Sequence, residues 1–176
     1  YLHGDESYVE CSNTIDITKD FTFHITFKPD DIIPDYNKSF DEYCVFSIPG
    51  WDTTIGYNSF NRYKFECWDI GKECHQITSD YDYPKLTRIS VTYDKSNRLL
   101  TMYQDGKEVG NKIVSRKLLD TKKEKFYIGI ADLRDDDRKS FRGFVSDFAY
   151  WNKALQKNEI QELTETFGLS YITDTG

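Results

Sequence analysis

The fold is decided by residues 21–29, which read Phe21-Thr22-Phe23-His24-Ile25-Thr26-Phe27-Lys28-Pro29. Apolar and polar side chains alternate strictly along this stretch, which is the period-two pattern of a β-strand with one buried face. Proline cannot donate to a strand ladder, so Pro29 marks the end of the strand. His24 falls on the polar face, where we expect it to face solvent or to be hydrogen-bonded.

Similar patterns recur on either side of this strand. A second alternating run, residues 88–93, precedes a polar turn at residues 94–97, and a third strand is predicted from Leu99 to Gln104. Asp105-Gly106 follows, the dipeptide best suited to a two-residue hairpin turn with positive φ at both positions. Shorter strands are predicted at residues 8–11, 43–48, 62–68, 126–130 and 141–151.

One segment near the end of the chain has helical spacing. Within residues 156–167, Ile160, Leu163 and Phe167 recur three or four residues apart, and Gly168 is the expected C-terminal stop. Many short strands separated by turn signals favour a sandwich or barrel over alternating β–α units. The composition agrees, because 12 Phe and 13 Tyr against a single Met suit a pleated, half-buried surface.

Length and charge bound the organisation of the chain. At 176 residues it is of one-domain size, and no repeat or linker divides it, so residues 1–176 are expected to form a single domain. The sequence does not begin with Met, which suggests a processed product or a module of a longer protein. The net charge of −7 is spread along the chain, so nucleic acid is not an expected partner. Membrane insertion is not expected either, since no apolar run approaches the ~20 residues that it requires.

Four cysteines, Cys11, Cys44, Cys67 and Cys74, lack the spacing of a zinc site. Cys67 and Cys74 lie symmetrically about Ile70-Gly71. If these two residues form a hairpin turn, the cysteines are directly opposed and could be bridged. The alternative is free thiols packed as small hydrophobes. The cysteines therefore do not decide the compartment.

Five segments, taken in order, carry a family pattern: residues 4–10, 21–29, 88–94, 103–106, and a last stretch running from Tyr127-Ile128-Gly129 through Phe141-Arg142-Gly143 to Trp151-Asn152-Lys153-Ala154-Leu155 and Glu159-Ile160. Through these segments the chain resembles the laminin-G-like and concanavalin-A-like jelly-roll domains, which include pentraxins and legume-type lectins. The last segment is the most specific, because a strand ending in Trp-Asn-x-Ala-Leu before a short helix is typical of them. Thr26 and Leu86 depart from the pattern, since many members carry Trp there.

The resemblance implies an all-β fold, with two antiparallel sheets in a jelly-roll sandwich and one short C-terminal helix. It also implies frequent binding of calcium and recognition of a carbohydrate or another protein. Glycoside hydrolases of this fold use Glu-x-Asp-x-x-Glu on one strand face, and the sequence lacks that spacing. We therefore expect no enzyme but a non-catalytic, lectin-like module that binds a glycan or glycoprotein, which favours an extracellular or surface-exposed location. The alternative is a protein-interaction or adhesion domain of the same fold.

Sugar binding requires an aromatic face against the pyranose ring, with amides and carboxylates that hydrogen-bond its hydroxyls. Suitable residues cluster around two connections: Trp51, Tyr57, Asn58, Phe60 and Asn61 around the first, and Trp68, Tyr81, Asp82 and Tyr83 around the second. We predict a ligand site among them. The ordinary role of such residues in an aromatic-rich sandwich is core or rim packing.

An acidic segment between two predicted strands is a candidate calcium site. It contains Asp132, Asp135 and Asp137, and calcium prefers six to eight oxygen ligands. The alternative is a solvated loop whose charges are balanced by Arg134 and Arg138.

A second calcium site is implied by the resemblance. It would lie between the Gly4-Asp5 loop and Asp147 on the last strand.

Overall fold

The computed structural model describes residues 1–4, 7–30, 42–49, 53–58, 62–80, 85–121, 123–130 and 138–169. Within them the chain forms two β-sheets, here called sheet A and sheet B. Sheet A contains, in spatial order, β1 (Leu2–His3), β13 (Arg142–Trp151), β3 (Phe21–Pro29), β8 (Thr87–Asp94), β9 (Leu99–Gln104) and β10 (Lys107–Ile113). Sheet B contains β2 (Val9–Thr14), β11 (Lys125–Ile128), β4 (Glu42–Ile48), β5 (Thr53–Asn58), β6 (Arg62–Trp68) and β7 (Cys74–Asp80), with β12 (Arg138–Ser140) paired to β4.

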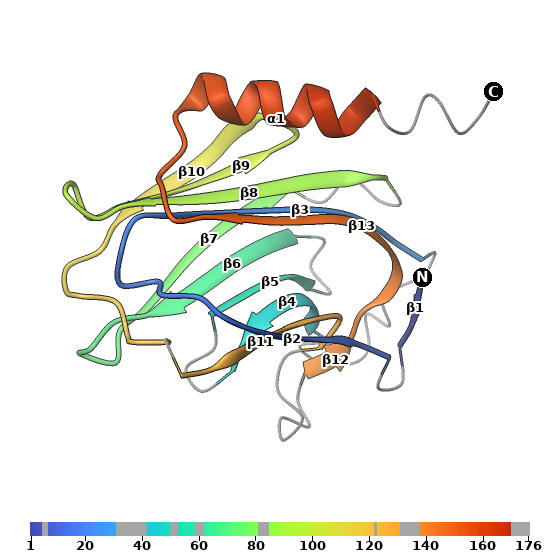
Figure 1. Cartoon of the computed structure of the whole chain (residues 1–176), viewed down its shortest axis with the longest axis horizontal. Helices are drawn as coiled ribbons and strands as arrows, with labels where there is room; N and C mark the ends of the chain where they lie inside the picture. Colours follow the sequence, from blue (N-terminus) through green and yellow to red (C-terminus); the bar gives the residue numbers. More distant parts are fainter. Residues whose placement is uncertain are drawn as a thin grey trace.

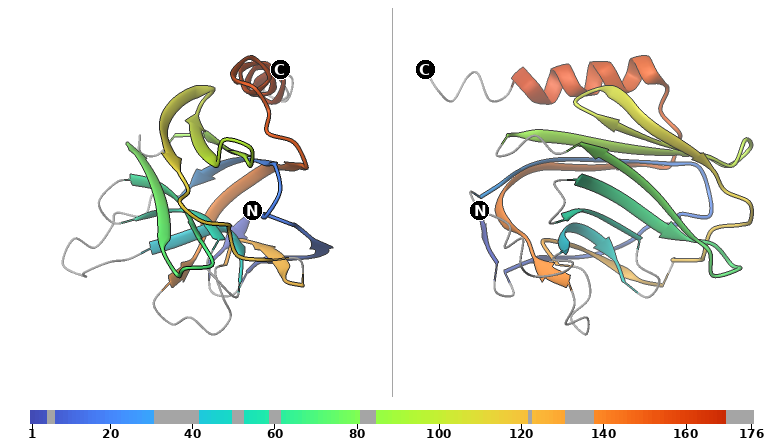
Figure 2. Two further views of the ribbon diagram at one scale, coloured as in Figure 1. Left: turned by 90° about the vertical axis from the view of Figure 1, so that its left-hand side faces the viewer. Right: turned by 180° about the vertical axis from the view of Figure 1, so that it is seen from behind.

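The two sheets face each other (Figures 1 and 2). Neighbouring strands are antiparallel, except that β12 runs parallel to β4. Early and late strands interleave, because β13 lies between β1 and β3 while β11 lies between β2 and β4. The predicted jelly-roll sandwich is confirmed.

The core lies between the sheets and is largely aromatic. Phe27 of β3 packs edge-on against Tyr63 of β6 and against Phe141, with ring centroids 5.6 Å and 5.9 Å apart. Phe46 of β4 stacks on Phe148 of β13 at 5.1 Å. The two sheets are therefore joined by ring contacts between their inner faces.

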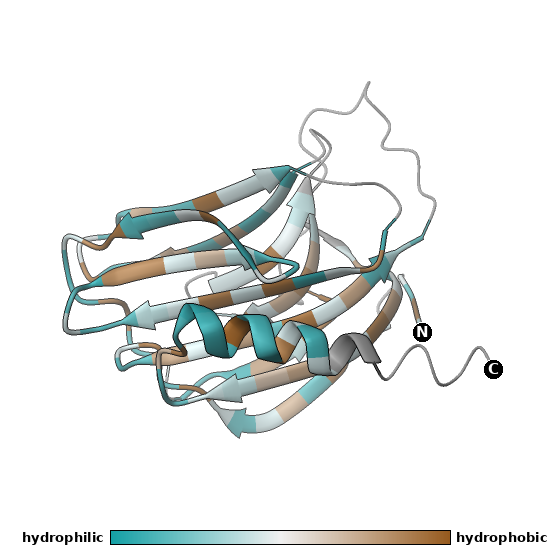
Figure 3. Cartoon of the chain, turned by 90° about the horizontal axis from the view of Figure 1, so that it is seen from above, coloured by the Kyte–Doolittle hydropathy of each residue, from teal (hydrophilic) through white to brown (hydrophobic). Residues whose placement is uncertain are grey.

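The strand β3 is buried on both faces, which corrects the expectation of one buried face. Its polar residues Thr22, His24 and Thr26 are 0% exposed. His24 Nδ1 and Ser90 Oγ of the neighbouring β8 are hydrogen-bonded at 2.8 Å, so the hydrogen-bonded interpretation of His24 holds. The helix α1 (Lys157–Leu169) lies over the outer face of sheet A (Figures 1 and 3). The segment before the helix also contacts this face, because Thr22 Oγ1 donates to the backbone oxygen of Lys153 at 2.7 Å.

The helix α1 matches the predicted segment except at its end. Ile160 is 0% exposed and anchors the helix. The backbone N–H of Gln156 donates to Glu159 Oε2 at 2.7 Å, which is half of a capping box at the helix start. The helix continues through Gly168 to Leu169, so the predicted stop at Gly168 is wrong. In the described ranges, no helix is long and apolar enough to cross a membrane.

The predicted hairpin at Asp105-Gly106 is confirmed. Its two turn residues have φ values of 49° and 79°, and they join β9 to β10. This turn type requires positive φ at both positions, which glycine adopts without strain and aspartate tolerates.

Candidate functional site

The hairpin formed by β6 and β7 lies at one edge of sheet B and presents polar groups on its outer face. Its register pairs Trp68 with Cys74 and Glu66 with Gln76. Lys64 lies two residues before Glu66 and therefore shares the same face. The alternate residues of β6 belong to the core, so this row points away from the sandwich interior.

Three of these side chains are linked. Glu66 Oε2 accepts hydrogen bonds from Lys64 Nζ at 2.9 Å and from Gln76 Nε2 at 2.8 Å. The side chains of Lys64 and Glu66 are 10% and 4% exposed, whereas Gln76 is exposed. Glu66 thus holds the Gln76 amide by its nitrogen.

Trp68 lies beside this linked group, at the end of β6. Its side chain is partly exposed, and its backbone carbonyl accepts the N–H of Leu119 at 3.0 Å. Among the described residues, no acceptor lies within hydrogen-bond distance of the buried indole Nε1. A partly exposed ring beside an oriented amide is the combination that sugar recognition requires.

Two residues of the first predicted ligand cluster lie on β5. Tyr57 is 8% exposed and stacks on Tyr43 with ring centroids 5.0 Å apart, so its ring serves core packing. Asn58 ends β5 opposite Arg62, and its side chain is outside the described part of the structure.

The remaining predicted positions lie outside the described residues: Trp51, Phe60, Asn61, Tyr81, Asp82, Tyr83, Asp5, Asp132, Asp135 and Asp137. The strand ends nevertheless separate one predicted group. β7 runs from Cys74, the partner of Trp68, to Asp80, a length of about 20 Å. Trp68 and Asp80 therefore lie at opposite ends of this hairpin.

Two residues of the calcium site implied by the resemblance, Gly4 and Asp147, lie in the described part of the structure. Gly4 is buried and follows His3, which pairs with Arg142. Asp147 lies five residues further along β13, about 15 Å away. Asp5, which the resemblance implies as a ligand, lies outside the described residues, so this calcium site stays a prediction.

The turn between β6 and β7 decides between the two alternatives for Cys67 and Cys74. Cys67 pairs with His75, not with Cys74, because the turn is one residue longer than Ile70-Gly71 and includes Lys72 at φ 62°. Cys67 therefore faces the core and Cys74 the outer face, and all four cysteines are free thiols. Burial raises the pKa of the Cys67 thiol strongly and that of Cys74 to about 11.

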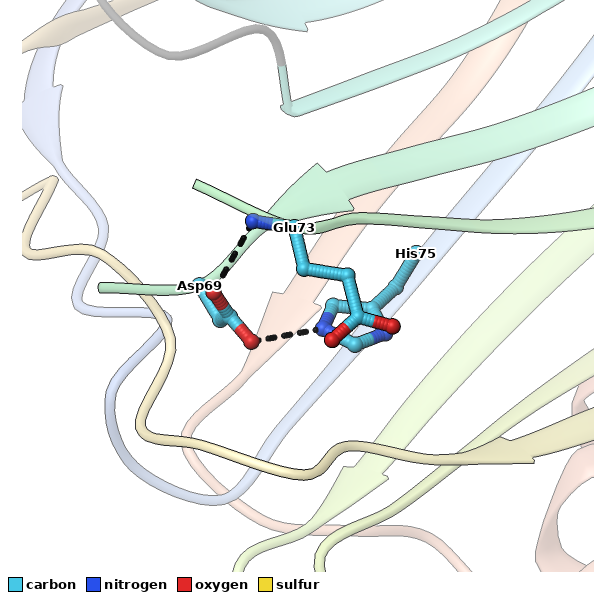
Figure 4. Close-up of side chains that lie close together, drawn as sticks. All are labelled: Asp69, Glu73 and His75. Atoms are coloured by element: carbon cyan, nitrogen blue, oxygen red, sulfur yellow. Dashed lines mark hydrogen bonds and ion pairs between the residues drawn. The ribbon is translucent and has the colours of Figure 1, made fainter. Parts of the chain in front are cut away.

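The same turn brings together three side chains that the sequence interpretation missed, Asp69, Glu73 and His75 (Figure 4). Asp69 Oδ1 accepts the backbone N–H groups of Gly71 at 2.8 Å and Glu73 at 3.1 Å. Asp69 Oδ2 accepts from His75 Nε2 at 3.1 Å. Burial would raise the pKa of Asp69, but the hydrogen bonds from Glu73, His75 and Gly71 lower it below its ordinary value. The spacing resembles no helical metal motif, so only knowledge of the three-residue turn could have revealed the group.

A separate aromatic group, here called the edge patch, lies on the outer face of sheet A where β1 meets β13. Tyr1 and Phe144 are 50% and 55% exposed, and the Tyr1 ring contacts Phe144 and His3 with centroids 4.7 Å and 4.8 Å apart. Asp30 accepts hydrogen bonds from the Tyr1 hydroxyl and from Arg142 Nε, the latter at 3.0 Å. Exposed aromatic rings beside a guanidinium group, here that of Arg142 bound to Asp30, are typical of an interaction surface.

A laminin-G model described as the concanavalin A-like lectin/glucanases superfamily matches residues 3–161. The binding domain of Paraclostridial mosquitocidal protein 1 has a TM-score of 0.74 and 15% identity, over 94% of this chain and 42% of that one. The ligand-binding domain of botulinum neurotoxin serotype D, in complex with N-acetylneuraminic acid, has a TM-score of 0.71 and 14% identity, over 94% and 41%. The binding domain of botulinum neurotoxin DC, in complex with rat synaptotagmin II, has a TM-score of 0.64 and 15% identity, over 85% and 36%.

At these identities the solved structures show a shared fold alone. The chain also spans only about two fifths of the length of those binding domains. No curated protein matches the sequence. The family model, in contrast, covers nearly the whole chain. The protein therefore belongs to the concanavalin A-like lectin/glucanases superfamily.

Proposed function

We propose that this domain is a non-catalytic carbohydrate-binding module and that it binds sugar on the outer face of the β6–β7 hairpin. The observation that carries the proposal is the partly exposed ring of Trp68 beside the amide of Gln76, which Glu66 holds in place. The ring offers a flat apolar face to a pyranose, and the amide hydrogen-bonds its hydroxyls.

Family membership supports this function, because the superfamily is described by its lectins and glucanases. The similar serotype D neurotoxin domain, which holds N-acetylneuraminic acid, adds an example of a glycan-binding protein that contains this fold. That ligand belongs to the neurotoxin domain, of which this chain matches 41%, so it does not name a sugar for this chain.

We propose that the domain is non-catalytic because of the arrangement of its carboxylates. Glycoside hydrolysis needs two carboxyl groups that flank the scissile bond. The strand motif that supplies them in this fold, Glu-x-Asp-x-x-Glu, is missing from the sequence. On the proposed face, Glu66 is bound to Lys64 and Gln76, which suits it to orient neighbours instead of attacking a substrate.

The experiment is a glycan array probed with the wild-type domain and with Trp68→Ala and Gln76→Ala. We expect each variant to lower binding about tenfold, the effect of losing roughly 1.4 kcal/mol of contacts. The matched control is Gln161→Ala, which removes an exposed amide from α1 and should bind like the wild type. Gln76 is exposed, so its variant should remain folded. Silence across diverse glycans would contradict the function, and unchanged binding by both variants would contradict the site.

Calcium assistance remains part of the proposal, with Asp132, Asp135 and Asp137 as the ligands. A chelator arm of the same array tests it. Binding that is lost with chelator and restored by added calcium supports the assistance, and binding that chelator leaves unchanged contradicts it.

A second candidate function is protein recognition through the edge patch. The exposed rings of Tyr1 and Phe144 favour it, and the similar DC neurotoxin domain is seen with a protein, rat synaptotagmin II. For a candidate surface protein, Phe144→Ser should abolish binding while Gln76→Ala leaves it unchanged. The reverse result would favour the hairpin. Under either function we propose an extracellular or surface-exposed location. Fractionation of cells that make the parent protein would test it.

A further inference from the structure

We propose that the tip of the β6–β7 hairpin is a transition-metal site of the zinc type, with Asp69, Glu73 and His75 as its ligands. Each residue offers one ligand atom, and these atoms all lie within 4.8 Å of one another (Figure 4). The inference does not depend on glycan binding, because it concerns the turn and not the face beside it.

The backbone of the turn holds the cluster in place. Lys72 adopts φ 62°, and the N–H groups of Gly71 and Glu73 both bind Asp69 Oδ1. Asp69 therefore keeps its other oxygen, Oδ2, directed at His75. The side chains of Asp69 and His75 are 0% and 1% exposed, so two ligands are positioned before any ion arrives.

The distance between these two ligand atoms suits a small ion. Donor atoms at 2.0–2.1 Å from a tetrahedral zinc ion lie about 3.3 Å from each other. Asp69 Oδ2 and His75 Nε2 are 3.1 Å apart. An ion can therefore replace the proton between them with an adjustment of only a few tenths of an ångström.

The proton displaced from Nε2 can move to the other ring nitrogen. Among the described residues, His75 Nδ1 is buried and has no hydrogen-bond partner. The ring can change tautomer without breaking another hydrogen bond, and no net proton is released. Nε2 is then free to donate its lone pair to the ion.

Glu73 provides the third ligand and the route of entry. Its side chain is exposed, and one oxygen, Oε2, accepts a hydrogen bond from Ser115 Oγ at 3.0 Å. The other carboxylate oxygen can turn toward the ion from the solvent side. Three protein ligands leave the fourth tetrahedral position to water.

The ligand types set the preference among metals. One imidazole and two carboxylates suit zinc and similar ions, whereas calcium requires six to eight oxygen ligands. Zinc should therefore bind here and calcium should not.

If Asp69 and His75 served only to stabilise the turn, the carboxylate of Glu73 would not be needed. Stabilising the turn uses only the backbone N–H of Glu73, which bonds to Asp69. Metal binding uses the Glu73 carboxylate as well. Glu73→Gln separates the two roles, because it keeps the backbone bond and weakens the ligand.

The test is calorimetric titration of the metal-free full chain with zinc, and separately with calcium. We expect one zinc ion per chain, at least about tenfold weaker binding by Glu73→Gln, and no binding of calcium to this site. The matched control Glu124→Gln removes an exposed carboxylate elsewhere, and His3→Gln removes an exposed imidazole. Both controls should bind zinc like the wild type. Cobalt, used as a spectroscopic probe, should give the intense visible absorption of tetrahedral coordination.

Three results would overturn the proposal: no zinc binding by the wild type, unchanged binding by Glu73→Gln, or loss of binding in His3→Gln. His75→Gln should abolish binding, but it alters a buried side chain, so its unfolding midpoint is measured alongside. Glycan binding is measured on the same samples in the array, so failure of either proposal is visible separately.

Discussion

At the scale of single residues, the outer face of sheet A hides an ionisable group. His24 is 0% exposed and bonds through Nδ1 to Ser90 at 2.8 Å. Burial, followed by the positive charge of Arg88, lowers the pKa of His24 from 6.5 to about 4. The unfolded chain binds this proton more readily than the folded chain, so protonation favours unfolding.

We predict that the free energy of unfolding decreases as the pH falls from about 6.5 to about 4. The folded pKa is the lower one, so this stability is complete above 6.5 and is lost on acidification, by roughly 3 kcal/mol in total. In His24→Gln this part of the pH dependence should disappear, whereas His3→Gln, which changes an exposed ring, should keep it. Urea unfolding at a series of pH values measures the effect. A wild-type curve that is flat across this window would refute the assignment.

At the scale of the elements, the two hairpins show what the sequence could and could not predict. The dipeptide Asp105-Gly106 predicts its turn from sequence alone, because Asp and Gly both tolerate positive φ. Lys72 also adopts positive φ, at 62°, but a lysine gives no indication of this conformation in the sequence. A one-residue difference in register moves a side chain to the other face of a strand. Cys74 thus faced the wrong way in the sequence interpretation, and the cluster around Asp69 stayed hidden.

The strands β5 and β7 were missed for related reasons. Gly56 interrupts the apolar pattern of β5, but a Cβ there would lie 2.3 Å from the backbone oxygen of Tyr43, so β4 can approach only a glycine. In β7 the inward positions are His75, Ile77 and Ser79, and two polar residues among three conceal the alternation. Sequence reasoning found the strands whose buried residues are apolar. It also named Trp68, while the side chains beside it required the strand register.

The corrected register makes a prediction about the thiols. In the folded chain, Cys67 should react slowly with a thiol reagent at pH 8, because burial raises its pKa and blocks access, and Cys74 should react faster because it is only partly buried. In denaturant all four thiols should react. Peptide mapping by mass spectrometry after partial labelling gives the order. A peptide that links Cys67 to Cys74 in the native protein would show that the register is wrong.

At the scale of the whole molecule, the candidate surfaces lie on different sheets. The proposed sugar face and the proposed metal tip share the β6–β7 hairpin of sheet B, where Trp68 directly precedes Asp69. The edge patch lies on sheet A, at β1 and β13. The proposed glycan site and the proposed protein site therefore do not overlap, and single substitutions at Gln76 and Phe144 address them independently.

The small extent of the hairpin face limits the affinity for sugar that we expect of the proposed site. One partly exposed ring and one oriented amide make few contacts, so we expect a dissociation constant of about 0.1–1 mM or weaker for a single domain. Presenting four domains on one carrier should tighten binding to a dense glycan surface by roughly 10²–10⁴-fold, because the later contacts become intramolecular. Surface plasmon resonance of the monomer and of a streptavidin-held tetramer measures the ratio, with tetrameric Gln76→Ala as the control. Equal affinity of monomer and tetramer would mean that the module binds through a larger and tighter surface than this hairpin.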